Sequence, residues 1–596
     1  GSINSNNYTM KTKFNGILTL LLALVVQISF AQEKTVSGTV SDTSGALPGV
    51  SVLLKGTTTG TETDFDGKYS IKAKAGDVLS FSYLGYKTVE KTVGSSSTLN
   101  VTMEEDANVL DEVVVTAQGI KREAKALGYA VAVITSKDIE SKPETDVAKI
   151  LTGKIAGVEV NTGGGFLGTS ANVIIRSKNS ISGNNQPLYI IDGAPVNGSR
   201  SFDIDPNNIA STTVLKGLAA STLYGNDGRN GVILITTKTG SGGDATDKKF
   251  EVTFSSTSSI LEVANLPEFQ NSYGQGADNA INTTFFGTWG AQLNGQTVPH
   301  HLSIDAYKDV FPQFQGQTVK YNAVPNNVTD FFGKGFGTVQ SLVINKSLGD
   351  GNGVSFSLGH TDQSGYIPEN GLRRYNLNFG GRAKLANNLS LNTSVGYTNT
   401  FTKRPTRNFF TLLTWIPRNL DIHNLPFENP NDGSSVYYRT TITNPRWQQK
   451  YTGITANTDR TFIKANLAYQ INDKINASYT YSLDNYSEVN RNWYNKGAVE
   501  NQLGFLNTVD NYTRITNHRL SLSSDSYELT KDIKFRGVLG TEAKNSFRSF
   551  KGINSSDQVV FNFLNHNNFR EHTSVQKQML LVFMVKWNLI IATTYI

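Results

Sequence analysis

The sequence contains no cysteine and only 15 prolines in 596 residues. The absence of cysteine excludes disulfide bonds, thiolate nucleophiles and cysteine-ligated zinc. Apolar residues make up only 38% of the chain, and no stretch reaches the roughly 18 consecutive apolar residues that a membrane-spanning helix needs. A membrane location would therefore require a β-barrel, whose strands satisfy their backbone hydrogen bonds by pairing.

Neither concentrated charge nor a catalytic pattern is found in the sequence. The formal net charge of +6 is spread along the chain rather than gathered into a basic run, so nucleic acid is not an expected partner. The seven histidines show no metal-binding spacing such as His-x-x-x-His, and no nucleophile elbow accompanies them. We therefore expect no metal site, no cofactor and no enzyme activity.

Residues 1–31 have the features of a secretory signal peptide. We take Met10 as the start, with residues 1–9 as an upstream extension, because two lysines and then an apolar run over 17–28 follow it. The run ends at Ser29-Phe30-Ala31, a small-x-small cleavage site. At about a dozen residues, this run is too short to cross hydrocarbon as a helix.

Residues 34–105 alternate short β-prone runs with Gly, Asp and Pro turns, which predicts a small β-sandwich of the transthyretin or immunoglobulin type. The predicted strands lie at 36–40, 50–54, 69–71, 78–83 and 99–103. Asp64-Phe65-Asp66-Gly67 lacks the further oxygen ligands and the terminal Glu of a calcium loop, so a tight Asp-Gly turn is predicted there.

Four stretches of this segment resemble a known domain. They are Val36–Asp42, Leu47–Val50, Gly60–Tyr69 and Phe81–Tyr86. Together they are similar to the carboxypeptidase-regulatory-like domain that begins many SusC-like TonB-dependent transporters. The resemblance implies no peptidase chemistry, which that domain lacks despite its name.

Residues 108–117 form a β-branched run with polar flanks. On periodicity alone, an ordinary strand or linker explains the run equally well. Its position between two domains, however, is where TonB-dependent transporters carry their TonB box, and it resembles that box. An extended peptide of this kind can add an edge strand to a partner sheet. The resemblance implies that TonB is bound by Leu110, Asp111, Glu112, Val113, Val114, Val115, Thr116 and Ala117.

Residues 118–245 read as a glycine-rich α/β segment, with a short helix at 146–151 and strands at 158–160, 173–176, 189–192 and 232–237. Its motifs resemble the plug of SusC-like transporters, in order and at the family's spacing. The motifs are Ala126–Val131, Leu151–Val160, Ser180–Gly193, Val214–Gly217, Leu223–Gly225 and Gly231–Lys238. Ser177 and Asn226–Arg229 depart from the usual family residues.

After residue 249 the sequence becomes hairpin-like. Alternating apolar residues flank the turns at 387–388, 472–474 and 530–532, and long polar stretches such as 399–460 join the other strand ends. A soluble β-sandwich shows the same alternation. The signal peptide and the plug decide for a transmembrane β-barrel over 250–578, with its short turns in the periplasm.

The predicted barrel is incomplete. Plugged outer-membrane transporters close with about 22 strands of roughly ten residues, whereas fewer than 350 residues follow the plug. Residues 579–596 lose the alternation and are predicted to be an out-of-frame tail that follows a frameshift near Gln578. The predicted fold class is thus mainly β: an N-terminal sandwich, an α/β plug and an incomplete antiparallel transmembrane barrel.

The family resemblance implies TonB-dependent active import across the outer membrane of a Gram-negative, Bacteroidetes-like cell. The substrate would be a glycan fragment or an oligopeptide beneath a SusD-like lipoprotein lid, and the barrel would contact outer-membrane lipid. The alternatives are a siderophore or cobalamin receptor, and a non-transporting fragment. Trp289, Trp415, Trp447 and Trp493 lie in loop-like stretches, where sugar stacking and an interfacial aromatic girdle are both compatible with them.

Overall fold

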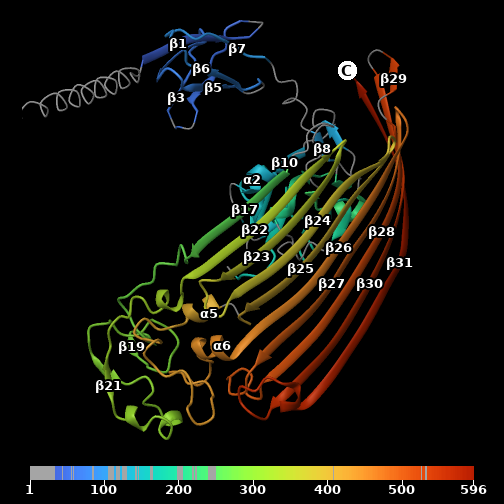
Figure 1. Ribbon diagram of the computed structural model, residues 1–596. Coiled ribbons are helices and arrows are strands. Elements are labelled where there is room, and N and C mark those ends of the chain that lie inside the picture. Colours follow the sequence, from blue (N-terminus) through green and yellow to red (C-terminus); the bar gives the residue numbers. More distant parts are fainter. Residues whose placement is uncertain are drawn as a thin grey trace, which may run out of the picture. The chain divides into compact units, whose positions relative to one another are not determined.

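The computed structural model describes residues 34–595 except for 43–44, 56, 58, 84–85, 105–112, 116–120, 124–130, 141–143, 145, 162–165, 197–205, 218–219, 222–223, 239–249, 407–408, 525–526 and 531–532. The predicted signal peptide lies outside these residues. The chain divides into two compact units, residues 1–114 with 121–128, and residues 115–120 with 129–596 (Figure 1). No helix in the described part is both long and apolar enough to cross a membrane.

The first unit is a sandwich of two small sheets, ordered β4-β1-β7 and β3-β2-β5-β6. The strands are β1 (Lys34–Ser41), β2 (Ser51–Leu54), β3 (Gly60–Glu62), β4 (Lys68–Ala73), β5 (Val78–Ser82), β6 (Val89–Thr92) and β7 (Val101–Thr102). Every second residue of β4 is buried, and one apolar core joins residues of both sheets. The predicted sandwich is confirmed.

Sequence patterns missed strands β3 and β6 of this unit. They correctly predicted its Asp-Gly turn. Strands β3 and β6 bury almost none of their side chains, so they carry no alternation to detect. The predicted Asp-Gly turn is present: the Gly67 N–H donates to the Asp64 carbonyl at 2.9 Å, and Asp64 Oδ1 accepts from Lys68 N at 2.8 Å.

One short strand lies in the predicted TonB box, and its partner strand follows the box. β8 (Val113–Val115) pairs with β9 (Lys121–Glu123). The remaining residues predicted to bind TonB, 110–112 and 116–117, lie outside the described residues. The structure therefore shows that the middle of the predicted box adopts the extended conformation that strand addition to a partner requires.

The second unit begins with a five-stranded sheet ordered β10-β15-β16-β13-β14 and a two-stranded sheet of β11 and β12. We call residues 131–238 the plug. Its elements are β10 (Val131–Thr135), α2 (Ser136–Glu140), α3 (Val147–Ile150), β11 (Val158–Asn161), β12 (Asn172–Ile175), β13 (Leu188–Ile191), β14 (Ala194–Val196), η5 (Pro206–Asn208), β15 (Ile209–Leu215), η6 (Gly225–Gly228) and β16 (Val232–Thr237).

The helix predicted at 146–151 is confirmed as α3, and Asp146 explains where it starts. The Asp146 Oδ1 accepts from the Ala148 N–H at 2.9 Å, which satisfies a backbone donor that the first helical turn leaves free. The Asp146 Oδ2 accepts from Ala171 N at 3.3 Å and ties the helix to the segment before β12. Val147, Ala148 and Ile150 then enter the plug core.

The rest of the second unit is an 11-stranded sheet, which we call the wall. Its strands pair in the order β17-β22-β23-β24-β25-β26-β27-β28-β30-β29, and β31 pairs with β30. The bounds are β17 (Phe250–Leu261), β22 (Gly335–Gly349), β23 (Asn352–Ser364), β24 (Gly371–Ala386), β25 (Leu389–Arg404), β26 (Thr452–Asn472), β27 (Ile475–Tyr494), β28 (Phe505–Ser524), β29 (Tyr527–Thr530), β30 (Ile533–Gln558) and β31 (Phe569–Tyr595).

Tight turns join the strands at one end of the wall and long loops at the other. The predicted turns at 387–388 and 472–474 are confirmed by the β24–β25 and β26–β27 pairings. The turn predicted at 530–532 lies mostly outside the described residues, and the strands on its two sides, β29 and β30, pair with each other. The long loops carry β18 (Gly276–Ala277), β19 (Ala280–Ile281), β20 (Thr297–Pro299), η7 (Asp305–Tyr307), η8 (Pro312–Phe314), β21 (Thr318–Lys320), η9 (Thr329–Phe331), α5 (Phe409–Thr414), α6 (Pro445–Tyr451) and η10 (His566–Asn568).

The wall strands are longer than the sequence analysis predicted. β25 runs to Arg404 and β26 starts at Thr452, so the loop predicted over 399–460 is shorter at both ends. The error arose because the outer ends of these strands are mostly polar, with isolated apolar residues such as Phe401 and Ile454 that form no regular hydrophobic alternation. The predicted tail lies in β31, which continues to Tyr595 and pairs with β30 throughout.

Candidate functional site

The plug lies against the inner face of the wall, and their seam is the first candidate site. Phe462 of β26 packs against the hydrophobic core of the plug. Gly168 approaches β25 so closely that a Cβ atom on it would lie 2.4 Å from the Thr402 Cγ2. Its φ of +73° also favours glycine. A larger residue at this position would therefore push the plug away from the wall.

Asp192 is the centre of a buried hydrogen-bond network in this seam. It lies in the turn between β13 and β14 with a φ of +49°, which few residues other than glycine adopt. Its Oδ1 accepts from Thr237 N at 2.9 Å and its Oδ2 accepts from the Thr237 hydroxyl at 2.5 Å, which fixes the end of β16. The Ser394 hydroxyl of β25 donates to the same Oδ2 at 3.0 Å. One carboxylate thus joins two plug strands to the wall.

Among the described residues, three further hydrogen bonds cross the seam, one of them from the Asn370 Nδ2 to the Leu167 carbonyl at 3.4 Å. The Arg519 Nη2 of β28 donates to the Gly193 carbonyl at 3.3 Å, and it also lies 3.3 Å from the Glu542 carboxylate. On another side of the plug, the Leu167 N–H donates to the Asn370 side-chain carbonyl at 2.9 Å. Each of these hydrogen bonds typically contributes about 0.5–1.5 kcal/mol.

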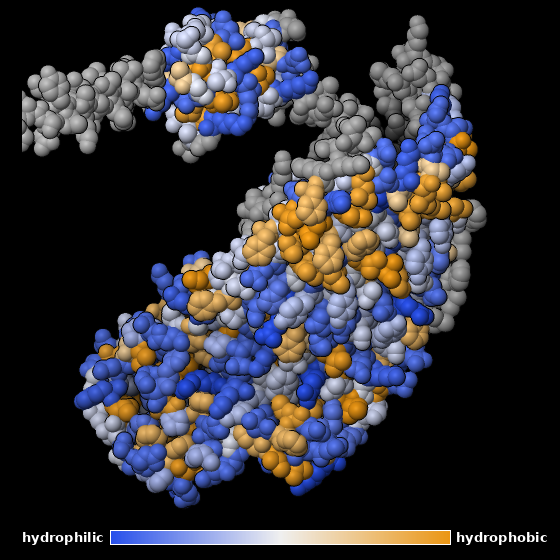
Figure 2. Space-filling model, in the orientation of Figure 1, coloured by the Kyte–Doolittle hydropathy of each residue, from blue (hydrophilic) through white to orange (hydrophobic). Residues whose placement is uncertain are grey.

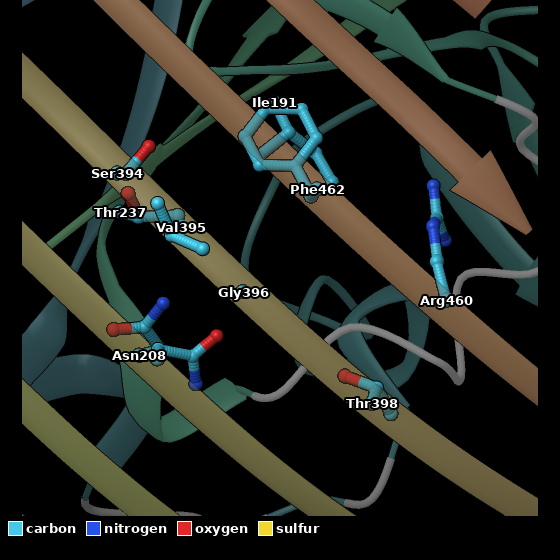
Figure 3. Close-up of a pocket in the computed structure, with 10 residues that line it drawn as sticks. Ile191, Asn208, Thr237, Ser394, Val395, Gly396, Thr398, Arg460 and Phe462 are labelled. Atoms are coloured by element: carbon cyan, nitrogen blue, oxygen red, sulfur yellow. The ribbon is translucent and has the colours of Figure 1, made fainter. Parts of the chain in front are cut away.

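A cavity of about 50 Å³ lies in the same seam (Figure 3). Its lining comprises Ile191, Asn208, Thr237, Asn378, Ser394, Val395, Gly396, Thr398, Arg460 and Phe462. The cavity has room for water but not for a nutrient molecule. We therefore interpret it as a hydrated gap between plug and wall.

Two buried charges on the inner face of the wall, Arg460 and Asp484, pair with each other. The Arg460 Nε and Nη2 atoms lie 2.9 and 3.1 Å from the two Asp484 oxygens, and these side chains are 8% and 3% exposed. This paired geometry satisfies two charges that would be costly to bury alone. Nearby, the Thr458 hydroxyl donates to the Glu488 carboxylate at 3.1 Å. Asp484 is therefore a counter-ion of Arg460 within the wall itself.

The outward face of the wall is apolar. Strand register places Phe254, Leu342, Leu358, Leu377 and Tyr397 side by side in one row across five strands. Figure 2 shows apolar side chains gathered over β22–β25, where this row lies. Leu358, Leu377 and Tyr397 are each more than 40% exposed. An exposed apolar band on the outside with polar residues inside is the arrangement of a transmembrane β-barrel.

The long loops contain the other candidate site residues. His301 is buried, and burial together with its neighbour His300 lowers the His301 pKa to about 4. Burial lowers the pKa of His300 as well, and its ring stacks on Phe314 with centroids 4.2 Å apart. Both imidazoles are neutral at pH 7 and serve loop packing. Among the described residues, no group of three or more His, Asp or Glu has the arrangement of a metal site.

The structure separates the four tryptophans that the sequence analysis placed in loops. Trp447 lies in α6, is fully buried, and donates from its Nε1 to the Gly433 carbonyl at 2.7 Å, so it cannot contact a substrate. Trp493 lies on β27 rather than in a loop. Trp289 is 79% exposed and Trp415 is 46% exposed. Only these last two remain candidates for ligand stacking.

Comparison with known proteins agrees with this architecture. A model described as "CarboxypepD_reg-like domain" matches residues 36–115, and one described as "TonB-dependent Receptor Plug Domain" matches residues 123–232. The chain is 32% identical over 445 residues to TonB-dependent receptor P26 of Formosa agariphila, which covers 72% of this chain and 40% of that receptor. It is 37% identical over 268 residues to TonB-dependent receptor SusC of Bacteroides thetaiotaomicron, which covers 43% of this chain and 26% of SusC.

The fold resembles that of a solved transporter. The RagAB peptide transporter superposes with a TM-score of 0.60 at 16% sequence identity, covering 78% of this chain and 53% of that chain. The RagAB peptide importer in its closed-closed state gives a TM-score of 0.58 at 16% identity, with the same two coverages of 78% and 53%. At this identity the likeness concerns the fold. The chain spans 40% or less of the length of the two curated relatives.

Proposed function

We propose that this chain, which belongs to the SusC-like TonB-dependent receptors, takes part in active import across the outer membrane, driven by TonB. The SusC-like receptors are a family of outer-membrane transporters rather than enzymes. The plug closes the passage that the wall lines, and TonB displaces the plug through the segment at 110–117. The substrate is a glycan fragment or an oligopeptide, and a SusD-like lipoprotein covers the loops.

The observation that carries this proposal is the way in which the plug contacts the wall. Its core packs on Phe462, and the polar contacts across the described part of the seam are one or two hydrogen bonds each, such as Asp192 to Ser394. The wall charges Arg460 and Asp484 already neutralise each other. Displacing the plug therefore breaks hydrogen bonds that typically contribute about 0.5–1.5 kcal/mol each, while the Arg460–Asp484 pair lies entirely within the wall.

The extended conformation of β8 supports the proposed TonB contact. Main-chain N–H and C=O groups of a short strand can pair with the edge of a partner sheet, and such pairing makes little demand on side chains. Val113–Val115 are β-branched residues that favour this conformation. A pulling force applied here reaches the plug through the chain that leads to β10.

The similarity to SusC and to the RagAB peptide importer supports the proposed substrate class and partner. A glycan fragment and an oligopeptide are both large polar ligands that need a wide mouth. The long loops, which carry α5 and α6 between β25 and β26, lie at the end of the wall where such a ligand enters.

Substituting Val114 by proline tests the TonB contact. Proline has no N–H and fixes φ, so a segment that carries it cannot pair along its length with a partner strand. We expect binding of the periplasmic domain of TonB to the detergent-purified chain to weaken at least about tenfold, as measured by biolayer interferometry. Val114→Ala, which keeps the N–H, serves as the control and should bind like wild type. Equal binding by the proline variant would refute the proposed contact.

A further inference from the structure

An exposed aromatic cluster lies in the long loops, away from the plug seam. The Phe286 and Trp415 rings lie 6.2 Å apart between centroids, tilted by 48°. The Arg439 guanidinium lies 4.9 Å from the Phe286 ring centroid. Phe285 stacks behind Phe286 at 4.9 Å. We call Phe286, Trp415 and Arg439 the loop platform. They come from three segments that are far apart in the sequence.

Buried residues hold each of these three segments in place. Gln275 is fully buried, and its Nε2 donates to the carbonyls of Thr283 and Phe285 at 2.6 and 2.8 Å, which fixes the turn that carries Phe286. Trp415 lies between Leu413 and Ile416, which are buried in a hydrophobic core. The platform is therefore formed before any ligand arrives.

The segment that carries Arg439 is anchored in the same way. Tyr437 and Tyr438 precede it in the chain, are both buried, and belong to the same core as Leu413. The Arg439 Nε donates to the Thr441 hydroxyl at 2.5 Å, which orients the guanidinium. Such anchoring reduces the conformational entropy that a ligand would otherwise have to overcome on binding.

The platform rings are exposed although they are large and apolar. Phe286 is 44% exposed and Trp415 is 46% exposed, whereas Leu413 and Ile416 beside Trp415 are almost completely buried. Leaving aromatic area in water is unfavourable by roughly 25 cal/mol per Å². Clustered exposed rings on an ordered surface mark a binding site more often than isolated ones do.

Arg439 adds hydrogen-bond donors at the edge of the rings. Within the described part of the chain, its two terminal nitrogens make no hydrogen bond and no carboxylate pairs with it. A guanidinium that is stacked on a ring and oriented through Nε still presents its terminal N–H groups as a fork. Such a fork suits the vicinal oxygens or the carboxylate of a ligand.

These features together fit a sugar ring. A pyranose has a flat face of C–H groups and an edge of oxygens, so one face can lie on an indole while the edge accepts hydrogen bonds. A protein partner would instead need a wider, continuous apolar area with a desolvated centre. We propose that the loop platform is a saccharide-binding site, in which a pyranose ring stacks on Trp415 beside Phe286 and Arg439 donates to its oxygens.

This inference rests on the proposed import function and specifies its substrate class. Neutral and acidic sugars share the chemistry that the platform recognises, because hydroxyl pairs and carboxylates both accept from Arg439. An acidic sugar would depend on the charge of Arg439, whereas a neutral sugar would depend mainly on the two rings.

The test uses the full chain, purified in detergent, on an array that carries neutral and uronate oligosaccharides together with random peptides. We expect wild type to bind at least one oligosaccharide family, and Trp415→Ala to weaken that binding about tenfold or more. Trp415→Phe keeps an aromatic face and should retain most of the binding even if the alanine variant perturbs α5. Trp289→Ala removes a more exposed indole outside the platform and should bind like wild type.

Arg439→Gln separates the two sugar classes. Loss of binding to uronates alone assigns an acidic ligand, and a moderate loss for neutral sugars assigns a hydroxyl pair. Three outcomes would overturn the proposal. The chain could bind no oligosaccharide, it could bind peptides only, or Trp289→Ala and Trp415→Ala could lose binding equally. If TonB binding still depends on Val114 in that case, the import function stands and only the platform is wrong. If TonB binding shows no such dependence while platform binding persists, the import function fails instead.

Discussion

At the scale of single residues, Asp192 combines an unusual backbone conformation with a buried carboxylate. Its φ of +49° places the side chain so that it caps β16 through Thr237 and reaches Ser394 on the wall. Asn and Asp tolerate this region of φ better than other non-glycine residues do. The position therefore needs both a short side chain and two acceptor oxygens.

Replacing Asp192 by alanine should loosen the plug. The change removes three hydrogen bonds, leaves the Thr237 N–H without its partner, and places a Cβ-bearing residue without a polar group at positive φ. We expect the local free energy of opening at β16 to fall by about 2 kcal/mol or more. Hydrogen exchange of the purified chain in detergent, followed at the end of β16, measures this quantity.

Asp227 provides the matched control for this experiment. It is an exposed aspartate in the same plug, in η6, and Asp227→Ala should leave exchange at β16 unchanged. Asp192→Asn keeps one acceptor oxygen and should lie between wild type and alanine. If the alanine variant exchanges as slowly as wild type, the network does not hold β16.

At the scale of elements, the β26–β27 hairpin shows how the chain sets strand register. Asn472 Oδ1 accepts from the N–H groups of Lys474 and Ile475, both at 2.9 Å. This side chain closes the turn before the long ladder begins. The register then places Leu467 opposite Tyr479, with both on the exposed face. A slip by one residue would turn the apolar row inward.

Substituting Asn472 by alanine should open the end of this hairpin without unfolding the wall. Losing two hydrogen bonds to backbone donors at an exposed turn should cost about 1 kcal/mol. We expect faster hydrogen exchange over the turn-proximal ends of β26 and β27, and unchanged exchange at their loop ends. Asp473→Ala, at the exposed neighbouring position, is the control and should not change the exchange rate. Equal acceleration in both variants would show that the side chain of Asn472 is not the cause.

At the scale of the whole molecule, the decisive feature is that the wall is an open sheet. Within the described residues, β17 pairs only with β22 and β31 pairs only with β30, so each has one free edge. Free strand edges are not tolerated in contact with lipid, because their N–H and C=O groups find no partner there. The outward apolar band thus favours contact with lipid, whereas the free strand edges disfavour it.

Gel mobility should show whether these edges close. Closed barrels resist unfolding in detergent until they are heated, and then migrate differently. We expect the 596-residue chain to migrate at the same position with and without heating, since its sheet has two free edges. A closed outer-membrane barrel on the same gel is the control. A heat-dependent shift would mean that the edges do pair, and it would contradict the open-sheet description.

Sequence patterns predicted five of the seven strands β1–β7, but only some elements of the second unit, among them α3, β13, β16 and the β26–β27 hairpin. The Asp-Gly turn at Asp64, the helix after Asp146 and the hairpin at Asn472 all follow from local rules, because side chains there bond to the backbone a few residues away. Some strands with one buried face, such as β4, were also predicted, whereas other strands, such as β15 and β23, were not. Strands β3 and β6 were missed because they bury almost none of their side chains and so show no hydrophobic alternation.

The sequence by itself determined the order of domains and the family, since motifs such as Ser180–Gly193 depend only on the residues present. Only the tertiary structure decided which residues contact each other. Asp192 contacts Ser394, and Phe286 contacts Trp415, across long separations in the chain that no local pattern encodes. Burial likewise removed Trp447 from the candidates and retained Trp415, because exposure depends on packing between distant segments.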